Sequence, residues 1–264
     1  MIYFLSPFYN EEEFLAKFID DLGKKAKQIA TEGFKIILVN DGSRDKSSKI
    51  AQSLKKRYPI IIISYDKNKG VDVAFKLGFE KIFQIAKNRD LIITLESDNT
   101  SDLSILDEMI QKSRNGVDVV LASCYAKGGG VYGTGIFRQG GSKIVNLLIY
   151  FLFPINGVKT YSSFYRTYNV GTFKKAWKAY SGKLINQKGF VCMVEMLIKL
   201  SKLPLKIEEV PMVLRWEGRR GKSKMKISKT LFGYWILFNE LFLREKLGFS
   251  SVISDAQGKW LELK

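Results

Sequence analysis

The sequence predicts an α/β fold with a mainly parallel sheet that helices cover on both faces. Three observations support this fold class. Five short apolar segments alternate with four segments of helical periodicity, the connections between them are short, and polar residues follow the apolar segments. Strands that alternate with helices in this way form parallel sheets, because each crossover helix packs against a face of the sheet.

The five expected strands are short apolar runs. They comprise residues 2–5, 35–39, 60–64, 91–95 and 117–123. The helices between them have apolar residues at helical spacing, as in the first, where Phe14, Phe18 and Leu22 share one face. They comprise residues 11–30, 45–58, 70–86 and 102–114, and Pro59 ends the second of them.

The alternation stops after residue 123. A glycine-rich stretch at residues 127–142 predicts a loop, and an almost wholly apolar stretch follows at residues 144–155. A second apolar and aromatic stretch, residues 231–243, lies in an expected helix from residue 227 to about residue 247. Both stretches are either core helices or helices that lie in a membrane interface. The other expected elements are a strand at 164–170, a helix at 190–200, and one or two strands at 205–216 with Pro211 at an edge or bend.

The composition excludes several kinds of chemistry. The 264 residues, 46% of them hydrophobic, are enough for one large domain. The chain has no histidine, which excludes Ser-His and Cys-His catalysis and His-ligated zinc sites. Cys124 and Cys192 lie far apart without metal-ligand spacing, so we expect a reducing compartment. We expect no signal peptide and no membrane-spanning segment.

The charge of the chain predicts an anionic partner. The formal net charge is +17, and residues 119–194 contain no Asp or Glu but ten Lys and Arg residues. Such a surface attracts phosphates, nucleic acid or an acidic membrane leaflet. Charge alone leaves open the alternative of a generally basic, soluble protein.

Two acidic residues follow the apolar run at residues 91–95. Glu96 and Asp98 come directly after this expected buried strand, at the edge of an open α/β sheet where ligands bind. Carboxylate oxygens are hard ligands that suit Mg²⁺ or Mn²⁺ carrying a diphosphate. The alternative is that Asp98 only caps the next helix.

Similar polar groups follow the first three strands, at the same edge of the sheet. They are Tyr9 and Glu11 after the first strand, Asp41 after the second, and residues 68–70 (Asn-Lys-Gly) after the third. A carboxylate can accept from a base N–H, and an aromatic ring can stack on a base. Each group alone is consistent with ordinary turn and cap chemistry. Their order along one edge indicates a nucleotide site.

These motifs resemble those of family 2 glycosyltransferases with the GT-A fold. The first half has P-x-Y-N-E-E at 7–12, V-x-D-G-S-x-D at 39–45, N-x-G at 68–70 and then the acid pair. In the second half, four stretches are similar to polyprenyl-phosphate glycosyltransferases. They are residues 116–130, 188–197, 206–212 and 221–224, so the resemblance covers roughly residues 1–240.

The resemblance implies roles for particular residues. The nucleotide sugar would be bound by Pro7, Tyr9, Glu11, Val39, Asp41, Ser97 and Arg219. A divalent metal, Mg²⁺ or Mn²⁺, would be held on the diphosphate by Glu96 and Asp98, where the family has D-x-D. The catalytic groups would be Asp98, with Arg138, Lys188 and Lys224 meeting the diphosphate or the acceptor phosphate.

The sequence departs from the family pattern at several positions. The first metal acid is Glu96, the Arg of an S-R-Y motif is replaced by Cys124, and an Asp is replaced by Thr160. The family Arg before G-x-S-K would fall on Gly218, so we expect Arg219 or Arg220 to substitute for it. The donor, either GDP-mannose or a UDP-sugar, stays open.

We expect an inverting glycosyltransferase that transfers a sugar to a polyprenyl or dolichyl phosphate. A hydroxyl acceptor needs a general base, normally a carboxylate, whereas a lipid phosphate needs only cations and an apolar surface. The segment without acids at residues 119–194 fits the lipid phosphate. The expected protein is cytoplasmic and peripheral on the cytosolic face of a membrane, and binds no nucleic acid. The alternatives are transfer to a glycan hydroxyl and a nucleotide-sugar-binding homologue of low activity; the oligomeric state stays open.

The expected domain organisation follows from these motifs. Residues 1–226 would form the GT-A domain, with a nucleotide-sugar half at 1–123 and an acceptor half at 124–226. Residues 227–264 would form a C-terminal amphipathic helix and tail.

Overall fold

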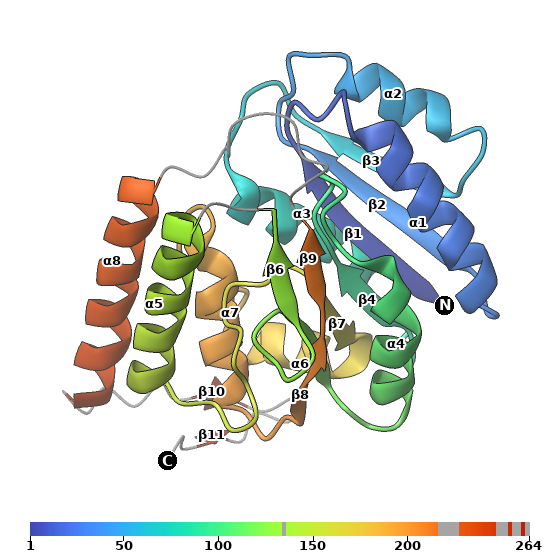
Figure 1. Cartoon of the computed structure of the whole chain (residues 1–264). Helices are drawn as coiled ribbons and strands as arrows, with labels where there is room; N and C mark the ends of the chain where they lie inside the picture. Colours follow the sequence, from blue (N-terminus) through green and yellow to red (C-terminus); the bar gives the residue numbers. More distant parts are fainter. Residues whose placement is uncertain (134–135, 216–226, 247–252, 255–259, 262–264) are drawn as a thin grey trace.

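Seven strands form one sheet in the order β3-β2-β1-β4-β7-β5-β8 (Figure 1). The computed structural model describes the backbone of residues 1–133, 136–215, 227–246, 253–254 and 260–261, and side chains at 1–133, 143–215 and 230–241. Only β7 in this sheet runs antiparallel to its neighbours, β4 and β5. The predicted, mainly parallel sheet is therefore confirmed. Its strands are β1 Ile2–Phe8, β2 Phe34–Asn40, β3 Ile60–Ser64, β4 Leu91–Thr94, β5 Val119–Ser123, β7 Arg166–Asn169 and β8 Ile207–Pro211.

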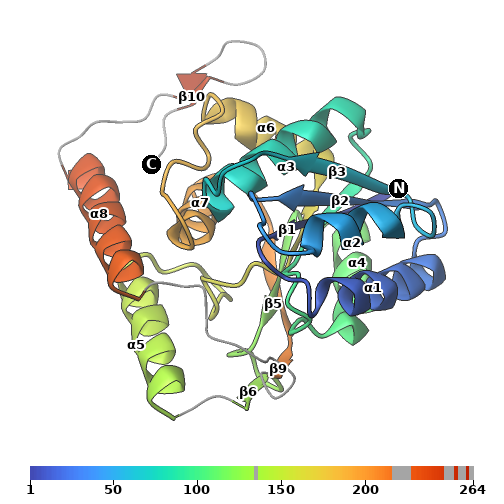
Figure 2. The same ribbon diagram turned by 90° about the horizontal axis from the view of Figure 1, so that it is seen from above.

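Helices cover both faces of this sheet because successive side chains of each buried strand point to opposite faces. In β1, Ile2 and Phe4 join one core cluster, whereas Tyr3 and Leu5 join the other. The first cluster lies under α1, α2 and α4, and the second lies under α3, α6 and α7 (Figure 2). These helices are α1 Leu15–Ile29, α2 Ser47–Leu54, α3 Val71–Ile85, α4 Leu106–Arg114, α6 Val170–Ala179 and α7 Val191–Ser201, with a short 3₁₀ turn Leu103–Ile105 before α4.

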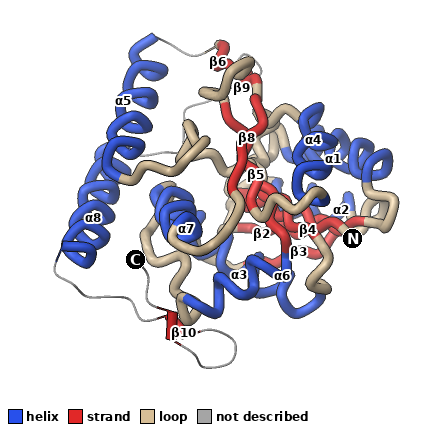
Figure 3. The backbone as a smooth tube through the Cα atoms, turned by 90° about the horizontal axis from the view of Figure 1, so that it is seen from below, coloured by secondary structure: helices blue, strands red, loops and turns tan. Residues whose placement is uncertain are grey.

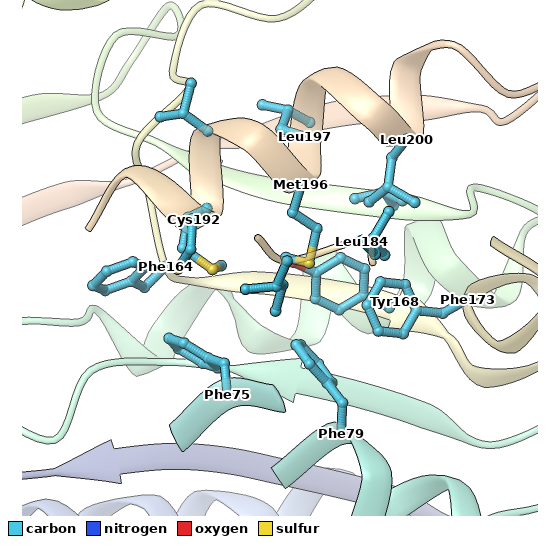
Figure 4. Close-up of a cluster of buried hydrophobic side chains, with 14 of the residues drawn as sticks. Phe75, Phe79, Phe164, Tyr168, Phe173, Leu184, Cys192, Met196, Leu197 and Leu200 are labelled. Atoms are coloured by element: carbon cyan, nitrogen blue, oxygen red, sulfur yellow. The ribbon is translucent and has the colours of Figure 1, made fainter. Parts of the chain in front are cut away.

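Aromatic side chains fill the core between α3, α6 and α7 (Figure 4). The ring of Phe173 lies 4.8 Å from that of Phe79 and 4.5 Å from that of Tyr168, between ring centroids. Phe75 contacts Phe164 in the segment that leads into β7, at 5.4 Å. Such pairs add to the stabilisation from burial, so this core supports the sheet edge beside β4.

Two helices, α5 Ile136–Leu152 and α8 Ile227–Lys246, lie together at one side of the molecule, away from α1 and α2 (Figures 2 and 3). The inner face of α8 packs on α7, where a Cβ on Gly233 would come within 2.9 Å of Val191. Leu237 and Leu241 of α8 are buried in the same core cluster as α7. Within the described part of the chain, no helix is long and apolar enough to cross a membrane.

The second half differs from the prediction in three places. The predicted loop at residues 127–142 contains a strand, β6 Gly130–Tyr132, and the first turns of α5, so that prediction is wrong in part. Strand β6 pairs with β9 Val213–Arg215 in a small separate sheet. Helix α6 was not predicted, although Asn169 caps it by accepting from the Gly171 N–H. The tail contains two short paired strands, β10 Ile253–Ser254 and β11 Trp260–Leu261.

Candidate functional site

The loops after β1 and β2 are hydrogen-bonded to one another at the carboxyl edge of the sheet. Asn10 is central, because its N–H donates to Ser43 Oγ at 3.0 Å and its side-chain oxygen accepts from the Arg44 N–H at 2.8 Å. The Glu11 N–H donates to Ser47 Oγ at 2.7 Å. The motifs that follow two separate strands therefore form one continuous surface.

The third loop joins this surface through Asp41, which is buried. Its carboxylate accepts from Asn68 Nδ2 at 2.9 Å and from the backbone N–H groups of Lys69 and Gly70, at 2.8 Å and 3.1 Å. Gly42 lets the loops approach, since its φ is +70° and the backbone of Lys67 and Asn68 lies beside it. Asp41 thus shapes the junction of these loops, and its predicted contact with a nucleoside stays a prediction.

The acid pair after β4 lies next to this junction. Ser97, between the two acids, donates from its Oγ to the Pro7 carbonyl oxygen of β1 at 3.0 Å. Asp98 is buried, and its Oδ1 accepts from the Thr100 N–H at 3.2 Å and the Thr100 hydroxyl at 2.6 Å. Glu96 Oε2 accepts from Ser101 Oγ at 3.1 Å. Both carboxylates are therefore oriented by hydroxyl groups from the loop that follows them.

The chemistry of this pair fits a divalent cation. Burial and the negative charge of Asp98 raise the pKa of Glu96 to about 7, against the lowering effect of hydrogen bonds that include one from the Phe164 N–H. A cation would relieve this repulsion between neighbouring carboxylates. No group of three or more Asp, Glu, Cys or His ligands occurs among the described residues. Mg²⁺ typically takes one or two carboxylates and completes its coordination with substrate phosphates and water.

The raised pKa of Glu96 leads to an expected pH dependence of stability. The folded protein holds a proton on Glu96 up to about pH 7, whereas the unfolded chain releases it near the ordinary value of 4.5. Because the folded state binds more protons in this window, the free energy of unfolding falls as the pH rises from about 4.5 to 7. The loss is on the order of 2–3 kcal/mol. Urea denaturation of metal-free protein between pH 5 and 8 measures it.

A matched pair of variants separates Glu96 from the other acids. Glu96→Gln should remove this part of the pH dependence, because glutamine does not titrate. Glu13→Gln changes an exposed glutamate at the start of the first helix region and should leave the dependence as it is. Equal pH dependence in the wild type and in Glu96→Gln would contradict the assignment.

Lys188 reaches the same edge from the second half of the chain. It is exposed and precedes α7, and the neighbouring Gly189 N–H donates to Asp72 Oδ1 at 2.7 Å. Burial raises the pKa of Asp72, while the Gly189 N–H and the charge of Lys188 lower it and the charge of Asp41 raises it. Lys188, Asp72 and Asp41 are therefore close enough to influence one another. Asp72 was not predicted from the sequence, although an acid in the first turn of a helix at this edge is a usable signal.

Two of the departures from the family pattern, Cys124 and Thr160, contact one another. The pKa of the Cys124 thiol is raised to about 11 by burial, against the lowering effect of a hydrogen bond with Thr160. The Thr160 hydroxyl also shares a hydrogen bond of 2.6 Å with Ser123 Oγ. Arg166 of β7 pairs with Thr94 of β4 on one side and with Leu121 of β5 on the other. Glu96 follows Thr94 by two residues and Ser123 follows Leu121 by two, so both lie at the same level of the sheet. Two strand spacings separate them by about 10 Å.

The other predicted site residues differ in burial and in whether the structure describes their side chains. Val39 is fully buried in the core, so only its backbone could meet a ligand. Tyr9 and Glu11 are partly exposed in the loop after β1. Arg138 lies in α5, but its side chain is outside the described residues, as are Arg219 and Lys224. The roles of all these residues stay predictions.

This sheet order and the acid pair at its carboxyl edge define an α/β protein of the GT-A class. Residues 3–177 match the family described as Glycosyl transferase family 2. This match covers more than half of the 264 residues, and the chain belongs to that family.

Relatives with assigned activities match over part of their length. The chain is 29% identical over 229 residues to a dolichol-phosphate mannosyltransferase of Pyrococcus furiosus, which is 86% of this chain and 60% of the relative. It is 32% identical over 145 residues to an undecaprenyl-phosphate 4-deoxy-4-formamido-L-arabinose transferase of Photorhabdus laumondii, which is 54% of this chain and 41% of the relative. The chain thus spans less than two thirds of the length of these relatives.

Solved structures support the fold. A glucosyl-3-phosphoglycerate synthase from Mycobacterium tuberculosis, crystallised with Mn²⁺, UDP and phosphoglyceric acid, has a TM-score of 0.63 at 14% identity, covering 97% of this chain and 80% of that one. A mannosyl-3-phosphoglycerate synthase from Rubrobacter xylanophilus has a TM-score of 0.61 at 14% identity, covering 100% of this chain and 86% of that one. At this identity, the likeness concerns the fold alone.

Proposed function

We propose that the protein is a glycosyltransferase that transfers a sugar from GDP-mannose or a UDP-sugar to a polyprenyl or dolichyl phosphate. Membership of family 2 supports sugar transfer, and the names of two relatives describe sugar transfer involving dolichol phosphate and undecaprenyl phosphate. The donor would occupy the edge formed by the loops after β1, β2 and β3.

The acid pair supports a place for the diphosphate at this edge. Glu96 and Asp98 would hold Mg²⁺ or Mn²⁺, which supplies positive charge for the negative charge that develops on a departing diphosphate. Thr100 and Ser101 hold the two carboxylates in place. Lys188, exposed at the same edge, would add a second positive charge from the protein itself.

One observation favours a phosphate acceptor over a hydroxyl acceptor: no acid of residues 124–215 is available as a base. Glu195 accepts from the Asn186 and Gln187 N–H groups, each at 2.7 Å, and pairs with Lys199. Glu209 accepts from the Lys159 and Thr160 N–H groups at 2.8 Å and 2.7 Å, and Glu208 pairs with Lys112 and Lys206. A phosphate oxygen is already anionic and needs no base.

Two exposed lysines would attract an anionic acceptor. Lys127 and Lys159 are exposed and line a cavity of about 330 Å³ whose wall also includes Glu208 and Glu209. Lys159, which lines this cavity, directly precedes Thr160. The two lysines were not predicted from the sequence as site residues, although both lie in the acid-free segment.

An apolar face on α5 and α8 supports the proposed placement of the protein at a membrane surface. The two helices lie at one side of the molecule (Figures 2 and 3). We use the term apolar face for their large exposed apolar side chains. Their exposed fractions range from 41% to 70%. A bilayer would cover this surface, and anionic lipids in it would attract the lysines that flank these helices in the sequence. Its residues are Ile144, Leu147, Leu148, Tyr150, Phe151, Leu152, Leu231, Phe232 and Trp235.

The apolar face yields a testable prediction. Phe151→Ser and Trp235→Ser should each weaken binding to vesicles with anionic lipid about tenfold, because each loses roughly 1.4 kcal/mol of apolar burial. Vesicle sedimentation measures the partition coefficient. Tyr132→Ser is the control, since Tyr132 is an exposed aromatic residue on β6 rather than on either helix. If Phe151→Ser and Trp235→Ser bind as the wild type does, this face does not contact lipid.

A release assay tests the proposed function. Purified protein is incubated with GDP- and UDP-sugars and Mg²⁺ or Mn²⁺, and release of the nucleoside diphosphate is measured with polyprenyl phosphate, with polyprenol, and without lipid. We expect release from one donor class only with polyprenyl phosphate. Equal release with polyprenol would indicate a hydroxyl acceptor, and donor binding without release would indicate a binding protein.

A further inference from the structure

Arg166, the first residue of β7, is the largest fully buried side chain of the described residues, with 0% exposure. Its guanidinium donates hydrogen bonds to three backbone carbonyl oxygens. Nε donates to Ser163 at 2.7 Å, Nη1 to Met193 at 2.9 Å, and Nη2 to Tyr161 at 2.7 Å. The side chain therefore joins the segment before β7 to helix α7.

Among the described residues, no carboxylate forms an ion pair with Arg166. Arginine stays protonated in proteins, so it cannot escape burial by losing its charge. A buried charge without a direct counter-ion is costly, and a well-packed apolar residue at such a place is often at least as stable. Arg166 is thus poorly explained by stability alone.

One peptide unit links Arg166 to the acid pair. The carbonyl oxygen of Ser163 accepts from Arg166 Nε, and the N–H of the same peptide, on Phe164, donates to the Glu96 carboxylate. Thr94 Oγ1 holds the next peptide by donating to the Phe164 carbonyl oxygen at 2.6 Å. The strand register agrees, because Thr94 pairs with Arg166 and lies two residues before Glu96. Hydrogen bonds in such a chain polarise one another.

We propose that Arg166 is a positioning residue for Glu96, acting through the Ser163–Phe164 peptide. The guanidinium fixes the direction of the carbonyl, and the rigid peptide plane then fixes the N–H that holds the carboxylate. Arg166 touches neither donor nor acceptor in this arrangement. The proposal rests on the metal site of the proposed function and adds a residue outside the acid pair.

Metal binding, measured separately from turnover, tests this proposal. Mn²⁺ is titrated into the protein by electron paramagnetic resonance in the presence of UDP or GDP, for the wild type, Arg166→Lys and Arg166→Met. Loss of a residue that orients a metal ligand typically weakens metal affinity about 10- to 100-fold. We expect a Kd increase of that size in both variants, because lysine keeps the charge but lacks the planar fork.

The matched control is Thr167→Val. Thr167 is the next residue of β7 and equally buried, and its hydroxyl has no hydrogen-bond partner among the described residues. This variant should keep the wild-type Kd. Partial unfolding would lower the number of Mn²⁺ sites per chain without changing their Kd, so a purely structural effect is distinguishable from lost positioning.

A double-mutant cycle identifies the path of the effect. In a Glu96→Gln background, Arg166→Lys should change the Mn²⁺ Kd less than twofold, because the group that it positions is no longer a carboxylate. Wild-type Kd in Arg166→Lys, or an undiminished effect in the Glu96→Gln background, would overturn the proposal and leave the proposed function intact. If the wild type does not bind Mn²⁺, the result contradicts both this proposal and the metal site of the proposed function.

Discussion

Asp98→Asn is expected to lower the rate of sugar transfer on the order of a thousandfold, which corresponds to about 4 kcal/mol of transition-state stabilisation. Asparagine has nearly the shape of aspartate, and its side-chain oxygen can still accept from the Thr100 hydroxyl, which donates to Asp98 at 2.6 Å. What is lost is the negative charge that would hold a divalent cation on the diphosphate. Initial rates with saturating donor, together with a thermal unfolding curve, measure the effect.

The chain offers a control of nearly identical local geometry. Asp102 accepts from the Ser104 N–H at 2.9 Å and the Ser104 hydroxyl at 2.6 Å, the same two-residue pattern that Asp98 forms with Thr100. Asp102 is not part of the acid pair, so Asp102→Asn should keep the rate within about threefold, since it alters only a helix cap. If Asp98→Asn is as active as Asp102→Asn, the acid pair is not the metal site. Glu96→Asp should preserve or raise metal-dependent turnover, because aspartate is the residue that the family motif has there.

Gly42→Ala is expected to disrupt the junction of the three strand-end loops. The φ of Gly42 is +70°, and a Cβ there would lie 2.5 Å from both the Asn68 nitrogen and the Lys67 carbonyl carbon. Backbone atoms cannot move aside as the end of a flexible side chain can. We expect a loss of about 3 kcal/mol in the free energy of unfolding, from strain in the left-handed region and the clash together. Donor affinity should fall at least tenfold, because the loop held by Asp41 must shift.

Gly116→Ala separates strain from clash. Gly116 has a φ of +88°, but nothing lies within 4 Å of a Cβ placed there. It should therefore lose only about 1 kcal/mol and keep its donor affinity. Urea denaturation and isothermal titration with nucleoside diphosphate measure both quantities. Equal losses in the two variants would mean that the loops do not meet at Gly42.

Much of the first half was predictable because its signals are local. Strand-sized apolar runs are followed by turn residues and acids, so the carboxyl edge and the acid pair could be placed together from the chain order alone. The resemblance to family 2, which the family match confirms, depended on the same motifs. Asp41 shows the limit of this reasoning. Its type and position were predicted, but its bonds to Asn68, Lys69 and Gly70 depend on the approach of another loop.

The second half was harder to predict because its key contacts join residues far apart in the chain. The bond between Arg166 and the Met193 carbonyl oxygen has no signature in either segment. Strand β7 runs antiparallel between β4 and β5, and a sequence pattern does not show the direction of a strand. The helical start of α5 was missed because glycines at residues 140 and 141 indicate a loop when judged by propensity alone.

Transfer of a radiolabelled sugar to polyprenyl phosphate tests the proposed function most directly. The donor class identified by nucleotide release is supplied with the label in the sugar, and the lipid-linked product is extracted and counted. Wild-type protein should form a labelled polyprenyl-phosphate sugar that requires Mg²⁺ or Mn²⁺, Asp98→Asn should form almost none, and Asp102→Asn should match the wild type. Two results would contradict the proposed function. One is equal formation of labelled lipid by Asp98→Asn, and the other is label that appears only in a product without phosphate-linked lipid.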